Sequence, residues 1–201
     1  SESYAHKLYE RHRNYLVRLL RLPGHNTLLN PGLTALLLDV TEQPIEAEKK
    51  QRQHYSGKKK VHSDKNLVVV KRSSRRVTFL SATYAGKHHD KKIADQEQIV
   101  YPPHSNLYKD TGFQGYEPHV QHNFTEKKPR GQDLTAQEKR TNRKISCVRV
   151  RVEHALSGVK RACVVKDVLR NTKDGSSDSV MVIACGLHNL RVGFANERCG
   201  G

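Results

Sequence analysis

Three acidic residues stand where a carboxylate could bind a metal ion. Asp39 and Asp110 lie at the ends of short apolar runs typical of strands, and Glu153 lies on a long amphipathic segment. If the two strands are neighbours in a mixed sheet, both aspartates leave the same edge, and a helix packed across the sheet can bring Glu153 above them. Clustered carboxylates repel one another unless divalent cations such as Mg²⁺ neutralise them. The pattern favours metal-assisted phosphodiester chemistry.

The elements that must position these acids are predicted from hydrophobic periodicity. Short apolar or β-branched runs predict strands over residues 33–40, 66–70, 76–83 and 106–109. Near-helical spacing predicts helices over residues 4–22, 90–98, from 134–138 through 159, and 179–191. Thr135 and Glu138 have capping-box spacing at the start of the third helix. The order strand–strand–strand–helix–strand–helix would bring the acids together.

The third helix carries an apolar stripe that faces the core: Ile145, Val148, Val152, Leu156 and Val159. Arg149, Glu153 and Lys160 gather on a neighbouring face. Glu153 could instead be the i,i+4 partner of Arg149 on an exposed face.

The charge of the chain predicts a polyanionic partner. Its 36 Lys and Arg residues against 20 Asp and Glu residues give a formal net charge of +16. Nucleic acid is the first candidate, and peripheral membrane binding is the weaker alternative, because no apolar run is long enough to span a bilayer. No secretory signal is evident, which favours a reducing compartment.

Four cysteines are widely spaced and form no C-x-x-C pair, so zinc binding is not expected. Cys147, Cys163 and Cys185 stand among apolar neighbours and are predicted to be core residues.

Seven ordered motifs resemble those of the DDE-superfamily transposases, in particular insertion-sequence family five and its Harbinger-like relatives. They lie at residues 39–45, 55–60, 86–91, 110–115, 127–131, 149–154 and 183–191. The order and spacing agree from about residue 33 to residue 192. Val40 departs from the small residue usual in the family, and Val61 interrupts a basic run that commonly continues with an arginine.

The resemblance implies an α/β, RNase H-like fold with a mixed five-stranded sheet flanked by helices. It implies that Asp39, Asp110 and Glu153 are catalytic and hold two Mg²⁺ or Mn²⁺ ions. Four residues are expected to support these acids: His89, Asp90, Arg149 and His154. Asp90 could instead be a helix N-cap. Seven residues are expected to contact DNA phosphates: Lys58, Lys59, Lys60, Lys127, Lys128, Arg130 and Lys160.

The resemblance also divides the chain into a basic helical segment over residues 1–32, the remnant of an upstream DNA-binding region, a catalytic domain over 33–192, and a flexible tail over 193–201. The implied activity is cleavage and strand transfer at transposon ends by a homodimer assembled on DNA. The implied location is the bacterial cytoplasm and nucleoid, or a eukaryotic nucleus. The alternatives are a catalytically silent, transposase-derived DNA-binding protein and a basic RNA-associated structural protein.

Overall fold

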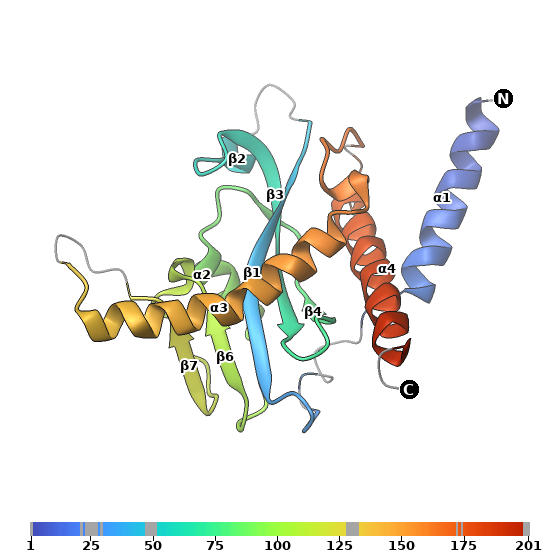
Figure 1. Ribbon diagram of the computed structural model, residues 1–201. Coiled ribbons are helices and arrows are strands. Elements are labelled where there is room, and N and C mark those ends of the chain that lie inside the picture. Colours follow the sequence, from blue (N-terminus) through green and yellow to red (C-terminus); the bar gives the residue numbers. More distant parts are fainter. Residues whose placement is uncertain are drawn as a thin grey trace.

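The computed structural model describes residues 2–20, 22, 28, 30–46, 52–127, 133–171, 173 and 175–198. A curled mixed sheet stands at its centre, with helices packed around it (Figure 1). The strands of this sheet are β1 (Ala35–Pro44), β2 (Tyr55–Ser56), β3 (Val61–Lys71), β4 (Val77–Leu80), β5 (Tyr84–Ala85), β6 (Asn106–Lys109) and β7 (His122–Thr125).

The strand order is β2-β3-β1-β6-β7, with β4 and β5 also paired to β3. β1 runs antiparallel to β3 and parallel to β6, and β6 runs parallel to β7. The predicted adjacency of the first strand and the strand that ends before Asp110 is confirmed. The layered α/β architecture is consistent with the RNase H-like fold.

The described residues form seven strands, but β2, β5 and β4 pair with successive stretches of β3, so the sheet is five strands across, as predicted. One detail of the predicted sheet is wrong. β1 continues to Pro44, so Asp39 lies within the strand rather than at its end. The polar residues of β1 belong to the strand because β3 pairs with them. One of them, Gln43, is buried, and its side-chain amide donates to the carbonyl of Val164 over 2.9 Å.

The described residues contain four α-helices: α1 (Glu2–Leu19), α2 (Asp90–Glu97), α3 (Ala136–Val159) and α4 (Ser176–Arg198). Short 3₁₀ turns cover Arg52–His54, Thr111–Phe113 and Cys163–Val165. α3 crosses the sheet over β6 and β1, and α1 packs against α4 on the outside (Figure 1). The capping box of Thr135 and Glu138 is confirmed. α4 continues as a helix to Arg198, whereas a loose tail was expected after Val192.

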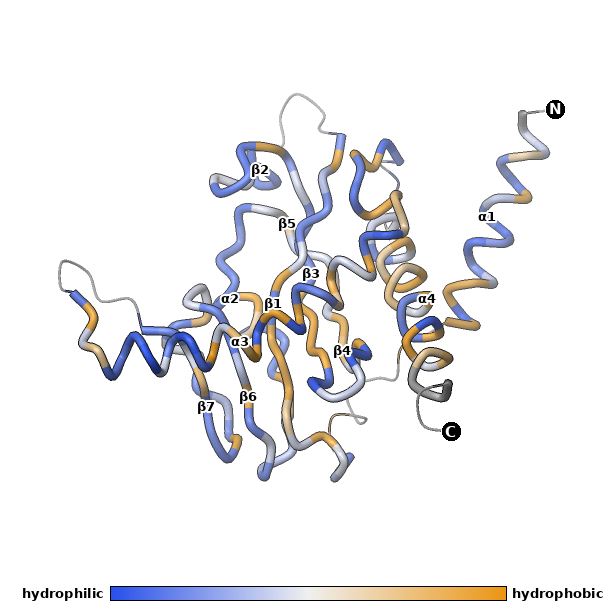
Figure 2. The backbone as a smooth tube through the Cα atoms, viewed as in Figure 1, coloured by the Kyte–Doolittle hydropathy of each residue, from blue (hydrophilic) through white to orange (hydrophobic). Residues whose placement is uncertain are grey.

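Two cores lie on opposite faces of the sheet, because side chains alternate along a strand. Leu36 and Leu38 of β1 join the core covered by α2, and Leu37 joins the core covered by α3 and α4. The apolar colouring in Figure 2 accordingly concentrates in the middle of the central strands. β1 is thus buried on both faces, as its continuous apolar run predicts.

The cysteine prediction is only partly correct. Cys185 is buried in the α4 core, but Cys147 and Cys163 are exposed free thiols. Residue Cys147 is on the outer side of α3, because the helix turns its apolar neighbour Val148 toward the core instead. In the described part of the chain no helix is long and apolar enough to cross a membrane.

Candidate active site

Asp39 and Asp110 occupy matching positions on neighbouring strands. The parallel register of β1 and β6 pairs Leu38 with Lys109, so the two aspartates are the next residues along. Leu37 and Tyr108 belong to the core on the α3 side. Since alternate residues share a face, both aspartates project toward α3.

Backbone amides hold both carboxylates. Oδ1 of Asp39 accepts the N–H of Val40 over 2.8 Å, and Oδ1 of Asp110 accepts the N–H of Thr111 over 2.6 Å. The second contact makes Asp110 the N-cap of the Thr111–Phe113 turn. In both aspartates the oxygen that accepts this hydrogen bond is Oδ1 rather than Oδ2.

The electrostatics of Asp39 indicate a cluster of acids. Burial raises the pKa of its carboxyl from 3.8 to about 6. The Val40 amide and the Arg149 charge oppose the shift, and the charges of Asp110 and Asp90 add to it. Three carboxylates therefore lie within electrostatic reach of one another, and we call Asp39, Asp90 and Asp110 the acidic site.

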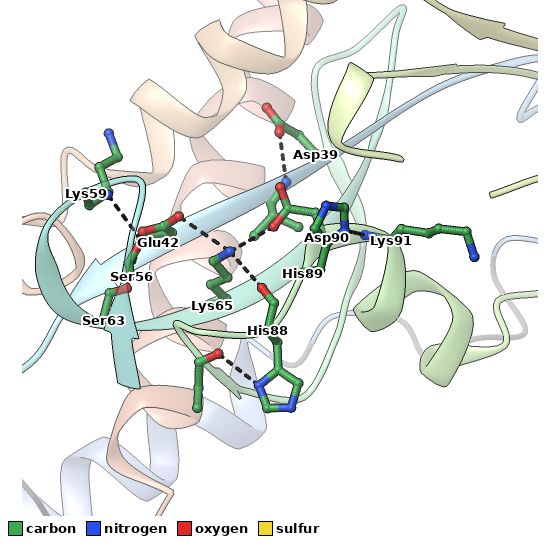
Figure 3. A network of polar contacts seen from close by, with 12 residues as sticks. Asp39, Glu42, Ser56, Lys59, Ser63, Lys65, His88, His89, Asp90 and Lys91 are labelled. Carbon is green, nitrogen blue, oxygen red and sulfur yellow. Dashed lines mark hydrogen bonds and ion pairs between the residues drawn. The ribbon is translucent and has the colours of Figure 1, made fainter. Parts of the chain in front are cut away.

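A lysine bridges the acids below Asp39 (Figure 3). Nζ of Lys65 lies 2.9 Å from Oδ1 of Asp90 and 3.7 Å from Oε1 of Glu42. It also donates to the carbonyl oxygen of His88 over 2.9 Å. Because Lys65 is almost fully buried, this network fixes the start of α2 beside the strands and holds Asp90 near Asp39.

The interpretation of Asp90 as a helix N-cap is wrong. His89 is the N-cap of α2, and its ring nitrogen accepts the N–H of Lys91 over 3.3 Å. Asp90 is the first helical residue, where its charge favours the helix dipole and its side chain is free to reach Lys65. Of His89 and Asp90, only the side chain of Asp90 contacts Lys65.

Arg149 of α3 contacts the acidic site directly. Its Nη1 lies 3.4 Å from Oδ1 of Asp110 and 3.5 Å from Oε1 of Glu126, and its side chain is only 12% exposed. These two carboxylates, rather than Glu153, are its ion-pair partners among the described residues. Arg149 therefore compensates charge at the acidic site.

Glu153 lies on α3 between two residues that reach the acidic site. Arg149 and Lys160 both interact electrostatically with Asp39. At about 100° per residue, both lie within about 40° of Glu153 around the helix. Glu153 is nevertheless exposed, and no ion pair links it to the aspartates in the described part of the chain. No described group of three or more His, Cys, Asp or Glu residues is close enough to hold a metal ion.

The expected phosphate-contacting lysines fall into two environments. Lys58, Lys59 and Lys60 form an exposed turn between β2 and β3, and Lys60 has a positive φ of 57°. Lys160 is half-buried at the C-cap of α3. Burial lowers its pKa, the Lys59 charge lowers it further, and the charges of Glu42 and Asp39 oppose the shift. The basic turn and the end of α3 therefore lie close to the acids.

Three expected residues lie elsewhere or outside the described residues. Lys127 is exposed and pairs with Glu138 over 3.3 Å. Lys128 and Arg130 lie outside the described residues. His154 lines a different hollow, beside α4. No contact among the described residues links it to the acids, so its expected role there stays a prediction.

Lys109 is fully buried next to Asp110, a position that the sequence did not predict. Its ammonium donates to the carbonyl of Tyr116 and lies 3.0 Å from Oε1 of Glu117. Burial lowers its pKa, and Glu117 opposes that shift. Lys109 ties down the loop that follows Asp110. The signal was a lysine that ends the short strand β6, directly before Asp110.

The donor set fits a hard divalent cation. Carboxylate oxygens are the ligands Mg²⁺ prefers, and a carboxyl whose pKa is raised by burial and neighbouring acids gains from a nearby cation. In the present arrangement the Arg149 guanidinium supplies part of that positive charge. Asp39 and Asp110 are the residues on adjacent strands whose carboxylates could hold the metal, whereas the expected third ligand, Glu153, has no contact with them among the described residues.

A mixed sheet of this order, with aspartates at matching positions of parallel strands beneath a crossing helix, defines an RNase H-like α/β protein. The family model of the DDE superfamily endonucleases matches residues 38–189, and the chain belongs to this family.

The chain is also similar to the "Probable transposase for insertion sequence element IS702" of Microchaete diplosiphon. It is 30% identical over 177 residues, which cover 85% of this chain. The match spans 64% of the length of that relative. No solved structure gives a significant match.

Proposed function

We propose that this chain is the catalytic domain of a transposase that cleaves DNA at transposon ends and transfers the freed strand to target DNA. The observation that carries this proposal is the matched placement of Asp39 and Asp110 on β1 and β6, together with the raised pKa of Asp39. The family membership and the similarity to a probable transposase support it.

In this proposal Asp39, Asp110 and Glu153 hold two Mg²⁺ or Mn²⁺ ions. When bound, such ions lower the pKa of an attacking water and stabilise a leaving 3′ oxygen. The protein contributes the placement of the carboxylates. The Val40 and Thr111 amides orient the two aspartates, and Glu153 rotates from solvent toward them as Arg149 turns from Asp110 toward a phosphate oxygen.

The partner in this proposal is DNA. Lys58, Lys59, Lys60 and Lys160 would contact backbone phosphates beside the acids, since such contacts position DNA without reading its sequence. Lys127, Lys128 and Arg130 would extend that contact. The active form would be a homodimer assembled on DNA at the nucleoid of a bacterial cell, and membership in insertion-sequence family five stays a prediction.

The test is nicking of supercoiled plasmid DNA in Mg²⁺ or Mn²⁺. Asp39→Asn, Asp110→Asn and Glu153→Gln are each expected to reduce nicking by about a thousandfold, because each removes transition-state charge stabilisation. EDTA should abolish nicking by the parent. Asp95→Asn is the matched control, because Asp95 is an exposed acid that pairs with Lys91 over 2.6 Å outside the acidic site.

Two outcomes would contradict the proposal. If Asp39→Asn and Asp110→Asn nick as well as Asp95→Asn, the acids are not catalytic. If the parent binds duplex DNA with a steep salt dependence but does not nick it in any divalent metal, the chain is a silent DNA-binding relative. The observation that favours this second function is the ion pair of Arg149 with Asp110, because the guanidinium supplies positive charge to the acids without a metal ion.

A further inference from the structure

A second charged cluster lies on another side of α3, away from the acids. Three arginines line one hollow of about 370 Å³: Arg75 from the turn before β4, Arg161 after α3, and Arg191 of α4. We call it the arginine pocket. Among the residues that the structure describes, none of the three has a carboxylate within ion-pair distance. The cluster therefore carries uncompensated positive charge.

A buried histidine holds two of these arginines. Nε2 of His188 lies 2.8 Å from the carbonyl oxygen of Arg75, and its Nδ1 lies 3.0 Å from Nη2 of Arg191. A carbonyl can only accept and a guanidinium can only donate, so His188 is the neutral tautomer with its proton on Nε2. His188 is 3% exposed, and it orients Arg191 toward the hollow while anchoring the Arg75 turn.

Neighbouring contacts make the arginine pocket rigid. Arg75 adopts a left-handed conformation with φ of 60°, which the turn imposes. Asn189 bonds both the N–H and the carbonyl of Val77 over 2.8 Å, which fixes α4 against β4. Gly158 of α3 lets Arg191 and His188 approach closely, because a Cβ there would lie 2.5 Å from both side chains. The pocket is thus held from three elements.

The charges in the arginine pocket affect one another. Burial lowers the pKa of Arg191, and the charges of Arg161 and Arg75 lower it further. Like charges held together in this way favour an anion between them. A guanidinium is suited to phosphate oxygens because its donors form a planar fork.

The arginine pocket stands at a short distance from the acids along α3. Arg161 lies in the turn directly after Lys160, the C-cap of α3, and Lys160 interacts electrostatically with Asp39 of the acidic site. A DNA backbone in the acidic site could reach both places at once.

We propose that the arginine pocket, formed by Arg75, Arg161 and Arg191, binds a backbone phosphate of the DNA whose phosphodiester is cleaved at the acidic site. The cleavage position rests on the proposed function; the phosphate binding does not. This pocket would fix the register of DNA on the protein, and His188 is a positioning residue for it.

The test is binding of a fluorescent DNA duplex, measured by anisotropy in EDTA, where cleavage does not occur. Arg161→Gln and Arg191→Gln are each expected to weaken binding about tenfold at 0.1 M salt and to reduce the slope of log K against log salt by about 0.9. Arg170→Gln is the control, because Arg170 is equally charged, exposed and outside the hollow. It should leave both quantities close to those of the parent.

Equal binding by all three variants would overturn the proposal. If inorganic phosphate raises the Tm of the parent but not of Arg161→Gln, while DNA binding is unchanged, the pocket holds free phosphate and the DNA assignment is wrong. Thermal unfolding verifies that each variant is folded. Because EDTA removes any contribution of divalent metal, failure of the proposed cleavage leaves this result unchanged, so the two proposals fail separately.

Discussion

The acidic site and the arginine pocket lie on two sides of α3, and each gathers side chains of one sign. The acidic site contains its own counter-charges, since Arg149 pairs with Asp110 and Lys65 pairs with Asp90. The arginine pocket contains no described counter-charge. The difference follows burial: Arg75 and Arg161 are exposed, so water and salt screen their repulsion, whereas the half-buried acids require partners within the fold.

This comparison suggests different routes to a ligand. A cation entering the acidic site must replace the guanidinium of Arg149, so its binding is an exchange. A phosphate entering the arginine pocket replaces only water and mobile ions. The charges of the acidic site are partly compensated by the protein itself, whereas those of the arginine pocket are left for a ligand.

Arg149 supplies the positive charge inside the acidic site, and its removal should cost the most stability. Arg149→Gln should lower the free energy of unfolding in EDTA by about 3 kcal/mol, because it leaves two partly buried carboxylates without their partner. Added Mg²⁺ should recover more stability for this variant than for the parent. Urea denaturation with and without Mg²⁺ measures both effects.

Arg143→Gln provides the control for that measurement, since Arg143 is exposed on the same helix and should change stability by less than about 0.5 kcal/mol. Equal stability of the Arg149 and Arg143 variants would show that the guanidinium does not stabilise the acids.

Removing the carboxylate of Asp39 should raise the free energy of unfolding, whereas removing Arg149 lowers it. Ionised Asp39 destabilises the metal-free fold, because its pKa is raised from 3.8 to about 6. The protonated carboxyl contributes stability below pH 4, and that contribution is lost as the pH rises through 6. Asp39→Asn should therefore raise the free energy of unfolding at pH 7.5 in EDTA by about 2 kcal/mol.

The pH dependence makes that prediction specific. The gain from Asp39→Asn should appear between pH 4 and pH 6, remain constant above that range, and vanish near pH 3.5. Denaturation of both proteins at these pH values measures it. A gain that is the same at pH 3.5 and pH 7.5 would mean that the ionisation of Asp39 is not its cause.

A weaker change in the free energy of unfolding is expected on the side of α3 that faces the arginine pocket. Gly158→Ala should lower the free energy of unfolding by about 1 kcal/mol, since the clash with the buried His188 ring exceeds the gain in helix propensity. It should also weaken DNA binding by displacing Arg191. The matched control is Gly193→Ala on α4, where a Cβ meets nothing within 4 Å and stability should rise. Stabilisation by both substitutions would contradict the tight packing at Gly158.

Local sequence signals predicted much of the fold. The bounds of β6 and the capping box of α3 agree with the structure, because each depends on neighbouring residues. The extension of β1 to Pro44 was missed because buried polar residues such as Gln43 form hydrogen bonds to partners far along the chain. Tertiary contacts, rather than periodicity, decide such positions.

The candidate site divides in the same way. The adjacency of Asp39 and Asp110 followed from strand order, and the position of Glu153 on α3 followed from the apolar stripe. The ion pair of Arg149 with Asp110 was not predicted, because spacing favoured Glu153 as its partner. The arginine pocket was also missed, since its members come from three separate segments and only the His188–Arg191 spacing on α4 is local.

The amide contacts of Asp39 and Asp110 bear on the choice between two alkaline-earth ions. Since Oδ1 of each carboxylate accepts the next backbone N–H, Oδ2 is the oxygen of each aspartate that is more available to an ion. Mg²⁺ accepts single oxygens in octahedral geometry and retains several waters, whereas Ca²⁺ takes more ligands and often both oxygens of a carboxylate. Carboxylates restrained in this way would discriminate against calcium through the geometry of the main chain.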